Sequence, residues 1–259
     1  MSRRRAQAYV ICTSPRSGST LLCRLLAATG TAGQPDSHFH TPTRAAWRKT
    51  YGLSDAVFAS DQDQLGAIFA AARARGTGET GVFGLRLQRG SFEFFMAQLA
   101  LLCPQHGSDA ARIKAVFGQT LFIHLTRTDK LGQAISCVKA RQTGLWHQAS
   151  DGTEVERTGP PQDPRFDRSA IATELGEFTA FDAAWTTWFS DQKLQPLRIT
   201  YEDLSRDPAA QLARVLAALG QDPAAAQASA PPLRKLAGAT NRDWAARFRA
   251  DDEGSQSRK

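Results

Sequence analysis

One stretch near the N-terminus decides the fold: residues 9–26 read YVICTSPRSGSTLLCRLL. Its first part, Tyr9–Cys12, is a short apolar run with β-branched side chains, which is typical of a buried strand. Leucines then recur at helical spacing at positions 21, 22, 25 and 26, and Gly30 marks the end of the predicted helix. A strand, a turn that contains Gly18 and a helix, in this order, begin a βαβ unit.

The same alternation continues along the chain. Buried strands are predicted at Thr120–Leu125 and Leu197–Tyr201, with a further strand at Val82–Leu85. Helices are predicted at residues 65–75, at 171–189, at 209–219 before Gly220, and around Leu131, Ile135 and Val138, which share one face. Strands that alternate with helices favour a parallel sheet covered on both faces. We therefore expect an α/β fold, a three-layer sandwich with a central, mainly parallel sheet and a P-loop-like nucleotide-binding core.

The chain shows no internal repeat and no boundary between domains, so residues 1–259 are predicted to form a single domain. Residues 1–7 and 252–259 are expected to be flexible termini. Residues 150–168 are polar and contain three prolines, and we interpret them as a long surface loop, with a lid over a site as its candidate role.

The composition is that of a globular protein. Of the 259 residues, 42% are hydrophobic and 22% are charged, which excludes disordered and collagen-like classes. No run of about 18 apolar residues is present, so no transmembrane segment is predicted. The apolar run at residues 6–12 is too short for a signal peptide, and we expect a cytoplasmic protein.

Cysteine and histidine spacings do not support a metal site. The four cysteines, Cys12, Cys23, Cys103 and Cys137, include no Cys-x-x-Cys pair, and we expect reduced thiols packed in the core. The five histidines form no His-x-x-x-His pair, so no metal ligand is predicted.

The charge balance favours anionic partners. Lys and Arg outnumber Asp and Glu by 32 to 25, which gives a formal net charge of +7. The basic residues are spread along the chain and form no stripe interleaved with aromatic residues, which argues against a nucleic-acid partner. Phosphorylated small molecules are the other class of partner that the charge allows.

The turn between the first strand and the first helix carries the features of a phosphate site. Backbone N–H groups and the positive end of the helix converge there. Gly18 lets the backbone approach an anion, Arg16 supplies a forked cation, and hydroxyl groups come from Ser17, Ser19 and Thr20. A plain polar turn that caps the helix is the alternative interpretation.

This turn departs from the P-loop of nucleotide hydrolases, in which a glycine precedes Gly-Lys-Ser/Thr after a four-residue gap. Thr13 stands at the position of the first glycine and Ser19 at that of the lysine. Hydrolysis of ATP or GTP is therefore disfavoured.

Several motifs resemble those of a known enzyme family. Residues 15–22, PRSGSTLL, resemble the 5′-phosphosulfate loop of sulfotransferases that use 3′-phosphoadenylyl sulfate (PAPS). With ATG at 28–30 and GQP at 33–35, they are similar to the Stf0 group. Further matches to this group are HLTRTDK at 124–130, QAIS at 133–136, QTGLW at 142–146, YEDL at 201–204 and WAARFR at 244–249. The resemblance covers nearly the whole chain, with a poor match over residues 60–110.

The resemblance implies an enzyme that moves a sulfuryl group from PAPS, by in-line transfer and without a metal, to a hydroxyl group of a carbohydrate, a glycolipid or a small metabolite. It implies that Arg16 and residues 17–20 hold the leaving 5′-phosphate, and that Arg127 and Ser136 hold the 3′-phosphate. Arg127 follows a strand and Ser136 lies in the next helix, so both can face the sheet edge where parallel-sheet proteins hold nucleotides. The alternatives are a surface ion pair of Arg127 with Asp129 and a plain helix-surface position for Ser136.

Sulfuryl transfer also calls for a base that removes the proton of the acceptor hydroxyl. The resemblance implies a glutamate at the position of Ser37, and a serine hydroxyl is no base at working pH. Asp36 is favoured as its replacement, with His38 and His40 as further candidates because histidine titrates near neutral pH. The alternative is that Asp36 caps a turn and both histidines are solvated. Because this loop is expected to touch the acceptor, the identity of the acceptor is left open.

Two other side chains are candidates for the site. Arg86 stands where the group tends to carry lysine, and a cation there would assist the sulfonate oxygens; an exposed surface arginine is the alternative. Trp146 is a candidate for stacking on a base or sugar, or else a core residue.

Two rival functions are considered. An ATP-dependent small-molecule kinase is disfavoured by the missing Gly-Lys pair, whereas a non-catalytic module that binds an adenosine bisphosphate is kept open by the missing glutamate. Nucleic-acid binding ranks last, and the sequence leaves the oligomeric state open, a homodimer included.

Overall fold

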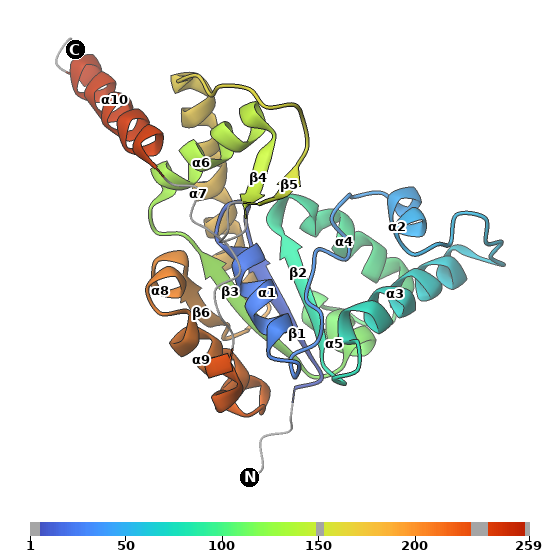
Figure 1. Ribbon diagram of the computed structural model, residues 1–259. Coiled ribbons are helices and arrows are strands. Elements are labelled where there is room, and N and C mark those ends of the chain that lie inside the picture. Colours follow the sequence, from blue (N-terminus) through green and yellow to red (C-terminus); the bar gives the residue numbers. More distant parts are fainter. Residues whose placement is uncertain (1–5, 149–152, 229–237, 257–259) are drawn as a thin grey trace.

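The computed structural model describes residues 6–148, 153–228 and 238–256 and has a parallel sheet at its centre (Figure 1). The sheet has four strands in the order β2-β1-β3-β6. Their bounds are Ala8–Thr13 for β1, Phe83–Gln88 for β2, Thr120–Thr126 for β3 and Leu197–Thr200 for β6. All three pairings are parallel, so the carboxyl ends of the four strands meet at one edge of the sheet.

Helices connect and cover these strands. They are α1 (Ser19–Ala28), α2 (Arg44–Thr50), α3 (Asp61–Thr77), α4 (Arg89–Leu102), α5 (Asp109–Phe117), α6 (Lys130–Thr143), α7 (Arg168–Asp191), α8 (Tyr201–Arg206), α9 (Pro208–Leu219) and α10 (Ala239–Gln256), with a short 3-10 helix at Pro223–Ala228.

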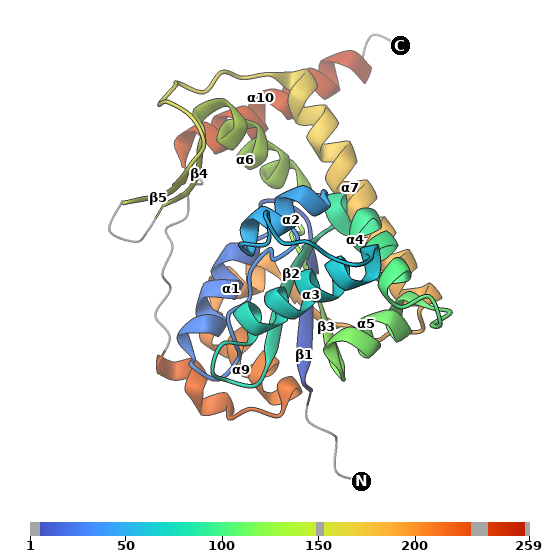
Figure 2. The same cartoon turned by 90° about the vertical axis from the view of Figure 1, so that its right-hand side faces the viewer.

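The side chains of β1 alternate between two cores, which makes the fold a three-layer sandwich. Val10 and Cys12 pack against α3, α4, α5 and α7, whereas Tyr9 and Ile11 pack against α1 and α9. In Figure 2, α1 and α9 lie on the left of β1, and α4 and α5 lie on its right. A third cluster joins α6, α7 and α10 beyond the carboxyl edge. The predicted α/β sandwich with a parallel sheet is confirmed.

The predicted strands are all present, with small changes at their ends. The last strand ends at Thr200 because the Thr200 hydroxyl accepts a hydrogen bond from the Asp203 N–H and caps α8, which begins at Tyr201. The helices predicted at 65–75 and 171–189 extend to residues 61–77 and 168–191.

The prediction of one continuous loop over residues 150–168 is wrong in part. Glu154–Arg157 forms strand β5, which pairs antiparallel with β4 at Leu145–Gln148. Residues 158–167 form neither a helix nor a strand, as predicted for a loop. Residues 149–152 lie outside the described residues. The pairing depends on contacts across the hairpin, which the proline-rich composition of the segment does not show.

The expected flexible termini fall largely outside the described residues. Residues 1–5 and 257–259 are not described, whereas the Gln7 N–H donates to the Gln119 carbonyl oxygen over 2.8 Å and residues 252–256 belong to α10. Within the described part of the chain, no helix combines the length and apolarity needed to cross a membrane.

The cysteine thiols agree with the prediction of packed, unpaired side chains. All four are free and buried, and burial raises the pKa of Cys23 and of Cys137 to about 12. A thiol with so high a pKa carries little thiolate at neutral pH and is unreactive.

Trp185 gives a test of how the sheet is held to its covering helix. Its indole N–H donates to the carbonyl oxygen of Thr13 over 3.0 Å, at the end of β1. We expect Trp185→Phe to lower the free energy of unfolding by about 1–3 kcal/mol more than a matched Trp→Phe change that breaks no hydrogen bond. Urea denaturation followed by circular dichroism measures this difference.

The matched control is Trp47→Phe. Trp47 is as deeply buried as Trp185, and its indole nitrogen has no hydrogen-bond partner among the described residues. Equal losses of stability for the two variants would show that the bond to Thr13 contributes nothing.

Candidate active site

A cavity of about 820 Å³ opens at the carboxyl edge of the sheet. Every strand of the sheet brings residues to it: the β1–α1 turn, Gln88 at the end of β2, Arg127 after β3 and Tyr201 after β6. The β4–β5 hairpin closes another side with Trp146 and neighbouring residues. This is the place at which parallel α/β sheets bind their ligands.

The turn between β1 and α1 is held by buried hydrogen bonds. The Thr13 hydroxyl donates to the Leu125 carbonyl oxygen of β3 over 2.8 Å and lies 2.5 Å from the Ser17 hydroxyl. From α6, the Gln133 amide donates to the Pro15 carbonyl oxygen over 2.6 Å. The protein's own hydrogen bonds therefore hold the backbone of the turn in place.

These bonds change the role predicted for Ser17. Its hydroxyl is fully buried, bonded to Thr13, and does not line the cavity. The prediction that the Ser17 side chain faces an anion is therefore wrong, whereas Gly18, Ser19 and Thr20 do line the cavity. Thr13, which replaces the first glycine of a P-loop, serves as the anchor of the turn.

Gly18 is required by both conformation and space. Its φ of 85° is left-handed, and a Cβ atom there would lie 2.7 Å from the Tyr201 ring. Gly18 is the N-cap of α1 and has no side chain with which to cap the first N–H groups of this helix. Uncapped N–H groups at the positive end of a helix suit an anion.

Arg16 joins the turn after β1 to the motif that follows β3. Its Nε donates to the Ser136 hydroxyl over 3.0 Å, and its Nη1 donates to the Trp146 carbonyl oxygen over 2.5 Å. The guanidinium also lies 5.9 Å from the centre of the Trp146 ring. Arg127 lines the same cavity; burial lowers the pKa of Arg16, and the positive charge of Arg127 lowers it further.

Arg127 is a buried cation rather than a surface one. It is 9% exposed, it stacks 4.7 Å from the centre of the Tyr201 ring, and its Nε has no hydrogen-bond partner within residues 6–148, 153–228 and 238–256. The ion pair with Asp129 is present at 3.6 Å, but Arg127 also lines the cavity. A buried guanidinium with an unused donor is suited to bind an oxyanion.

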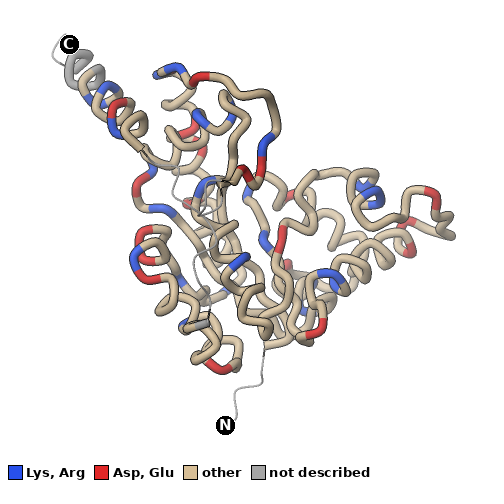
Figure 3. Tube along the Cα trace, in the orientation of Figure 1, with Lys and Arg blue, Asp and Glu red and all other residues tan. Residues whose placement is uncertain are grey.

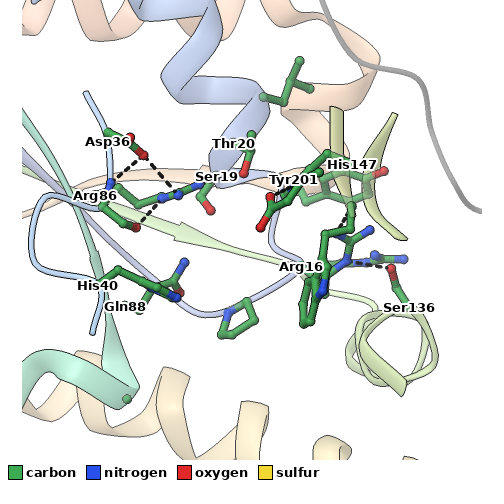
Figure 4. A pocket seen from close by; sticks show the side chains of 18 of the residues that line it. Arg16, Ser19, Thr20, Asp36, His40, Arg86, Gln88, Ser136, His147 and Tyr201 are labelled. Atoms are coloured by element: carbon green, nitrogen blue, oxygen red, sulfur yellow. Dashed lines mark hydrogen bonds and ion pairs between the residues drawn. The ribbon is translucent and has the colours of Figure 1, made fainter. Parts of the chain in front are cut away.

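Arg86 supplies a third cation, on the far side of the helix N-terminus. It donates to the Thr20 hydroxyl over 2.6 Å and to the Ser37 hydroxyl over 2.7 Å, and it pairs with Asp36 at 3.3 Å. Figure 4 shows Arg86 and Asp36 on one side of Ser19, with Arg16 on the other. The alternative of an exposed surface arginine is thereby excluded.

The candidates for the base lie in different surroundings. Asp36 and His40 line the cavity, and the Asp36 carboxylate accepts the Ser37 N–H over 2.7 Å. His38 does not line the cavity: its Nε2 lies 3.1 Å from the Gln34 carbonyl oxygen, and its ring stacks on Phe83. Burial lowers the pKa of His38. The prediction that His38 acts as a base at this cavity is therefore wrong, because the side chain points into the core.

Several lining residues were not predicted as part of the site. They include Gln88, His147, Glu156 and Tyr201. Because Tyr201 directly follows a strand, its position in the sequence predicts that it lies at the carboxyl edge of the sheet. No local sequence pattern predicts that His147 and Glu156 line the cavity. The described residues contain no group of three or more His, Cys, Asp and Glu side chains placed to hold a metal ion.

Basic residues occur along most of the trace, interspersed with acidic ones (Figure 3). The positive charge relevant to the cavity is therefore the local convergence of Arg16, Arg86 and Arg127 rather than one basic face.

Comparison with known proteins points to one family. The profile of the family described as Stf0 sulphotransferase matches residues 8–251. The trehalose 2-sulfotransferase of Mycobacterium tuberculosis (strain ATCC 35801 / TMC 107 / Erdman) is 30% identical over 268 residues, which cover 96% of this chain and 96% of the relative. That of Mycolicibacterium smegmatis (strain ATCC 700084 / mc(2)155) is 30% identical over 263 residues, which cover 94% and 95%. Among solved structures, the sulfotransferase domain from the Synechococcus PCC 7002 olefin synthase has a TM-score of 0.40 and 17% identity, covering 86% of this chain and 76% of that chain.

The conformation of the turn can be tested with Gly18→Ala. We expect this variant to lose about 1–2 kcal/mol of stability through the left-handed backbone and about 1–3 kcal/mol more through the clash with the Tyr201 ring. Urea denaturation measures the loss.

Gly30→Ala is the matched control, because Gly30 has a φ of 67° and a Cβ atom there meets nothing within 4 Å. The Gly30→Ala variant should lose only the stability due to the left-handed backbone, about 1–2 kcal/mol. If both alanine variants lose the same stability, the close approach of Tyr201 to the turn has no energetic weight.

Proposed function

The chain belongs to the Stf0 sulfotransferase family, and from this premise we propose that it transfers a sulfuryl group from PAPS to a hydroxyl group of a carbohydrate, a glycolipid or a small metabolite. The observation that carries the proposal is the contact between Arg16 and Ser136. It brings the turn after β1 and the motif after β3 into one cavity, where one ligand with two anionic ends can reach both.

The two ends of the donor are assigned from the groups that face the cavity. The 5′-phosphosulfate is proposed to lie at the uncapped N–H groups that begin α1, beside Arg16. The 3′-phosphate is proposed to bind Arg127, whose Nε has no hydrogen-bond partner among the described residues, together with Ser136. The ring of Tyr201, stacked on Arg127, supplies an apolar wall between these ends.

The proposed reaction is an in-line displacement at sulfur. The acceptor oxygen forms a bond to sulfur while the bond from sulfur to the 5′-phosphate oxygen breaks, and the leaving phosphate gains negative charge. Preplaced donors stabilise charge where it develops. The N–H groups at the start of α1 and the Arg16 guanidinium are proposed to serve in this way, with Arg86 next to them through Thr20.

The acceptor is proposed to carry several hydroxyl groups. The relatives are named for trehalose, and the wall of the cavity away from Arg127 carries polar groups from Asp36, His40 and Gln88. Such groups suit a sugar. Because Ser37 replaces the expected glutamate and is bonded to Arg86, the preferred sugar is proposed to differ from trehalose.

A cytoplasmic location is part of the proposal. The four free cysteine thiols fit a reducing compartment. The rival kinase function finds no lysine at the turn, since Ser19 occupies that position.

Nucleotide binding tests the two ends of the site. In calorimetric titration with 3′-phosphoadenosine 5′-phosphate, we expect Arg16→Ala and Arg127→Ala each to weaken binding by about 10- to 100-fold, because a hydrogen bond to a charged group contributes about 1.5–3 kcal/mol. Arg73→Ala is the matched control, since Arg73 lies on α3 outside this cavity. Unchanged affinity in either site variant would remove that arginine from the nucleotide site.

Turnover separates an enzyme from a binding module. With labelled PAPS and a panel of acceptors that includes trehalose, other disaccharides and glucose, we expect a sulfated sugar and stoichiometric release of 3′-phosphoadenosine 5′-phosphate. Tight nucleotide binding with no sulfated product from any acceptor would support the non-catalytic alternative instead.

A further inference from the structure

The β4–β5 hairpin presents a histidine and a carboxylate to the cavity as one unit. His147 and Glu156 are directly opposite each other in the two strands, and both line the cavity. The Nδ1 of His147 lies 2.6 Å from Oε2 of Glu156.

The hairpin is fixed to the end of α6. The Thr158 N–H donates to the Gly144 carbonyl oxygen over 2.8 Å, and Arg157 donates to the Thr143 carbonyl oxygen over 2.6 Å. The strand register shifts on both sides of His147. Such irregularities re-aim a side chain, and they are common beside active sites.

Trp146, the residue before His147, is hydrogen-bonded to the turn between β1 and α1. Arg16, which lies in the turn between β1 and α1, donates to the carbonyl oxygen of Trp146 over 2.5 Å. The residue after Trp146 is His147, and Figure 4 shows its ring on the same side of the cavity as Arg16, beside Tyr201. His147 therefore shares the cavity with Arg16 and Arg86, and the positive charges of both arginines act on its ring.

The protonation of this histidine suits proton removal. With Nδ1–H donated to Glu156, the lone pair of the ring lies on Nε2, and no partner of Nε2 is found among the described residues. Burial lowers the pKa of His147, and the charges of Arg16 and Arg86 lower it further, against the opposite effect of Glu156. The neutral form is therefore the main one at pH 7.

The other candidates in the cavity are less suited. Both contacts of the Asp36 carboxylate, with Arg86 and with the Ser37 N–H, are made by Oδ1, and its side chain is 66% exposed, against 22% for His147, so Asp36 is held less closely in the cavity. His38 lies in the core, and His40 has no carboxylate partner among the described residues that would fix its tautomer.

We propose that His147, oriented by Glu156, is the general base of the reaction. As the acceptor oxygen bonds to sulfur and the bond from sulfur to the 5′-phosphate breaks, the acceptor proton passes to Nε2 of His147, and the imidazolium is stabilised by Glu156. This inference rests on the proposed sulfuryl transfer. His147 is the catalytic residue in this account, and Glu156 is a positioning residue.

The test compares His147→Gln, Glu156→Gln, His40→Gln and the control His106→Gln in the full-length protein, with PAPS and the best acceptor of the panel. We expect His147→Gln to lower kcat by about 100-fold or more, the size typical of lost general-base catalysis. The affinity for 3′-phosphoadenosine 5′-phosphate should stay within about threefold of the parent, since a base does not hold the nucleotide. His106 lies between α4 and α5, away from the cavity, and its variant should keep parental activity.

The pH profile gives a readout that a structural role would not move. In the parent, kcat should fall as the pH drops through an apparent pKa below about 6.5, the ordinary value for histidine. This acid limb should disappear in His147→Gln, and Glu156→Gln should shift it while lowering kcat by a smaller factor. Added imidazole should restore part of the activity of His147→Ala.

The outcomes distinguish the two levels of the account. The base assignment is wrong if the parent sulfates an acceptor and His147→Gln does so at a rate within threefold of the parent. It is also wrong if His40→Gln alone removes the fall of kcat at low pH. In both cases the sulfotransferase function stands. If the parent binds nucleotide but sulfates nothing, the proposed function is wrong and the base assignment falls with it. If His147→Gln does not fold, Glu156→Gln tests the base assignment instead. A shift in the apparent pKa at which its kcat falls supports the assignment, and an unchanged pH profile contradicts it.

Discussion

The hydroxyl group of Thr13 is the constraint on which the site depends. It bonds the end of β1 to the Leu125 carbonyl oxygen of β3 and to the Ser17 side chain, and all of these groups are buried. With the turn held in this way, Gly18 takes its left-handed conformation, and α1 begins without a side-chain cap from Gly18 at residues that line the cavity. The same turn directs Arg16 across the edge of the sheet to Ser136. One buried hydrogen-bond junction thereby sets the relative positions of the two motifs.

The electrostatics of the cavity favour an anionic ligand. Arg16, Arg86 and Arg127 all line it, and like charges gathered in a partly buried space raise the free energy of the empty protein. Within the described residues, the hydrogen-bond partners of the Arg16 guanidinium are neutral oxygen atoms, those of Ser136 and Trp146. An anion that reaches these groups relieves the repulsion. Positively charged groups that already converge on the cavity favour both the binding of an anion and the stabilisation of negative charge that develops in a reaction.

Local patterns predicted much of the fold, whereas the site required tertiary contacts. Strand, turn and helix over residues 9–26 follow from periodicity and from one glycine, and the positions of Arg16, Gly18 and Arg127 at the sheet edge follow from the βαβ order. The directions in which the His38 and Ser17 side chains point could not be predicted in this way. His38 bonds to the Gln34 carbonyl oxygen and Ser17 bonds to the Thr13 hydroxyl, and no local pattern predicts these hydrogen bonds. The hairpin was missed for the same reason: Glu154–Arg157 becomes a strand only by pairing with Leu145–Gln148. Helices α2 and α5 were readable from their capping side chains, Thr43 and Ser108, but were not predicted.

A crystal structure of the protein with bound 3′-phosphoadenosine 5′-phosphate would show directly whether one nucleotide spans the turn after β1 and the motif after β3. The account predicts one nucleotide in the cavity, with its 5′-phosphate within hydrogen-bond distance of the N–H groups of residues 18–20 and its 3′-phosphate in contact with Arg127 and Ser136. A nucleotide bound elsewhere, or one whose 3′-phosphate projects into solvent while Arg127 keeps its present contacts, would contradict it.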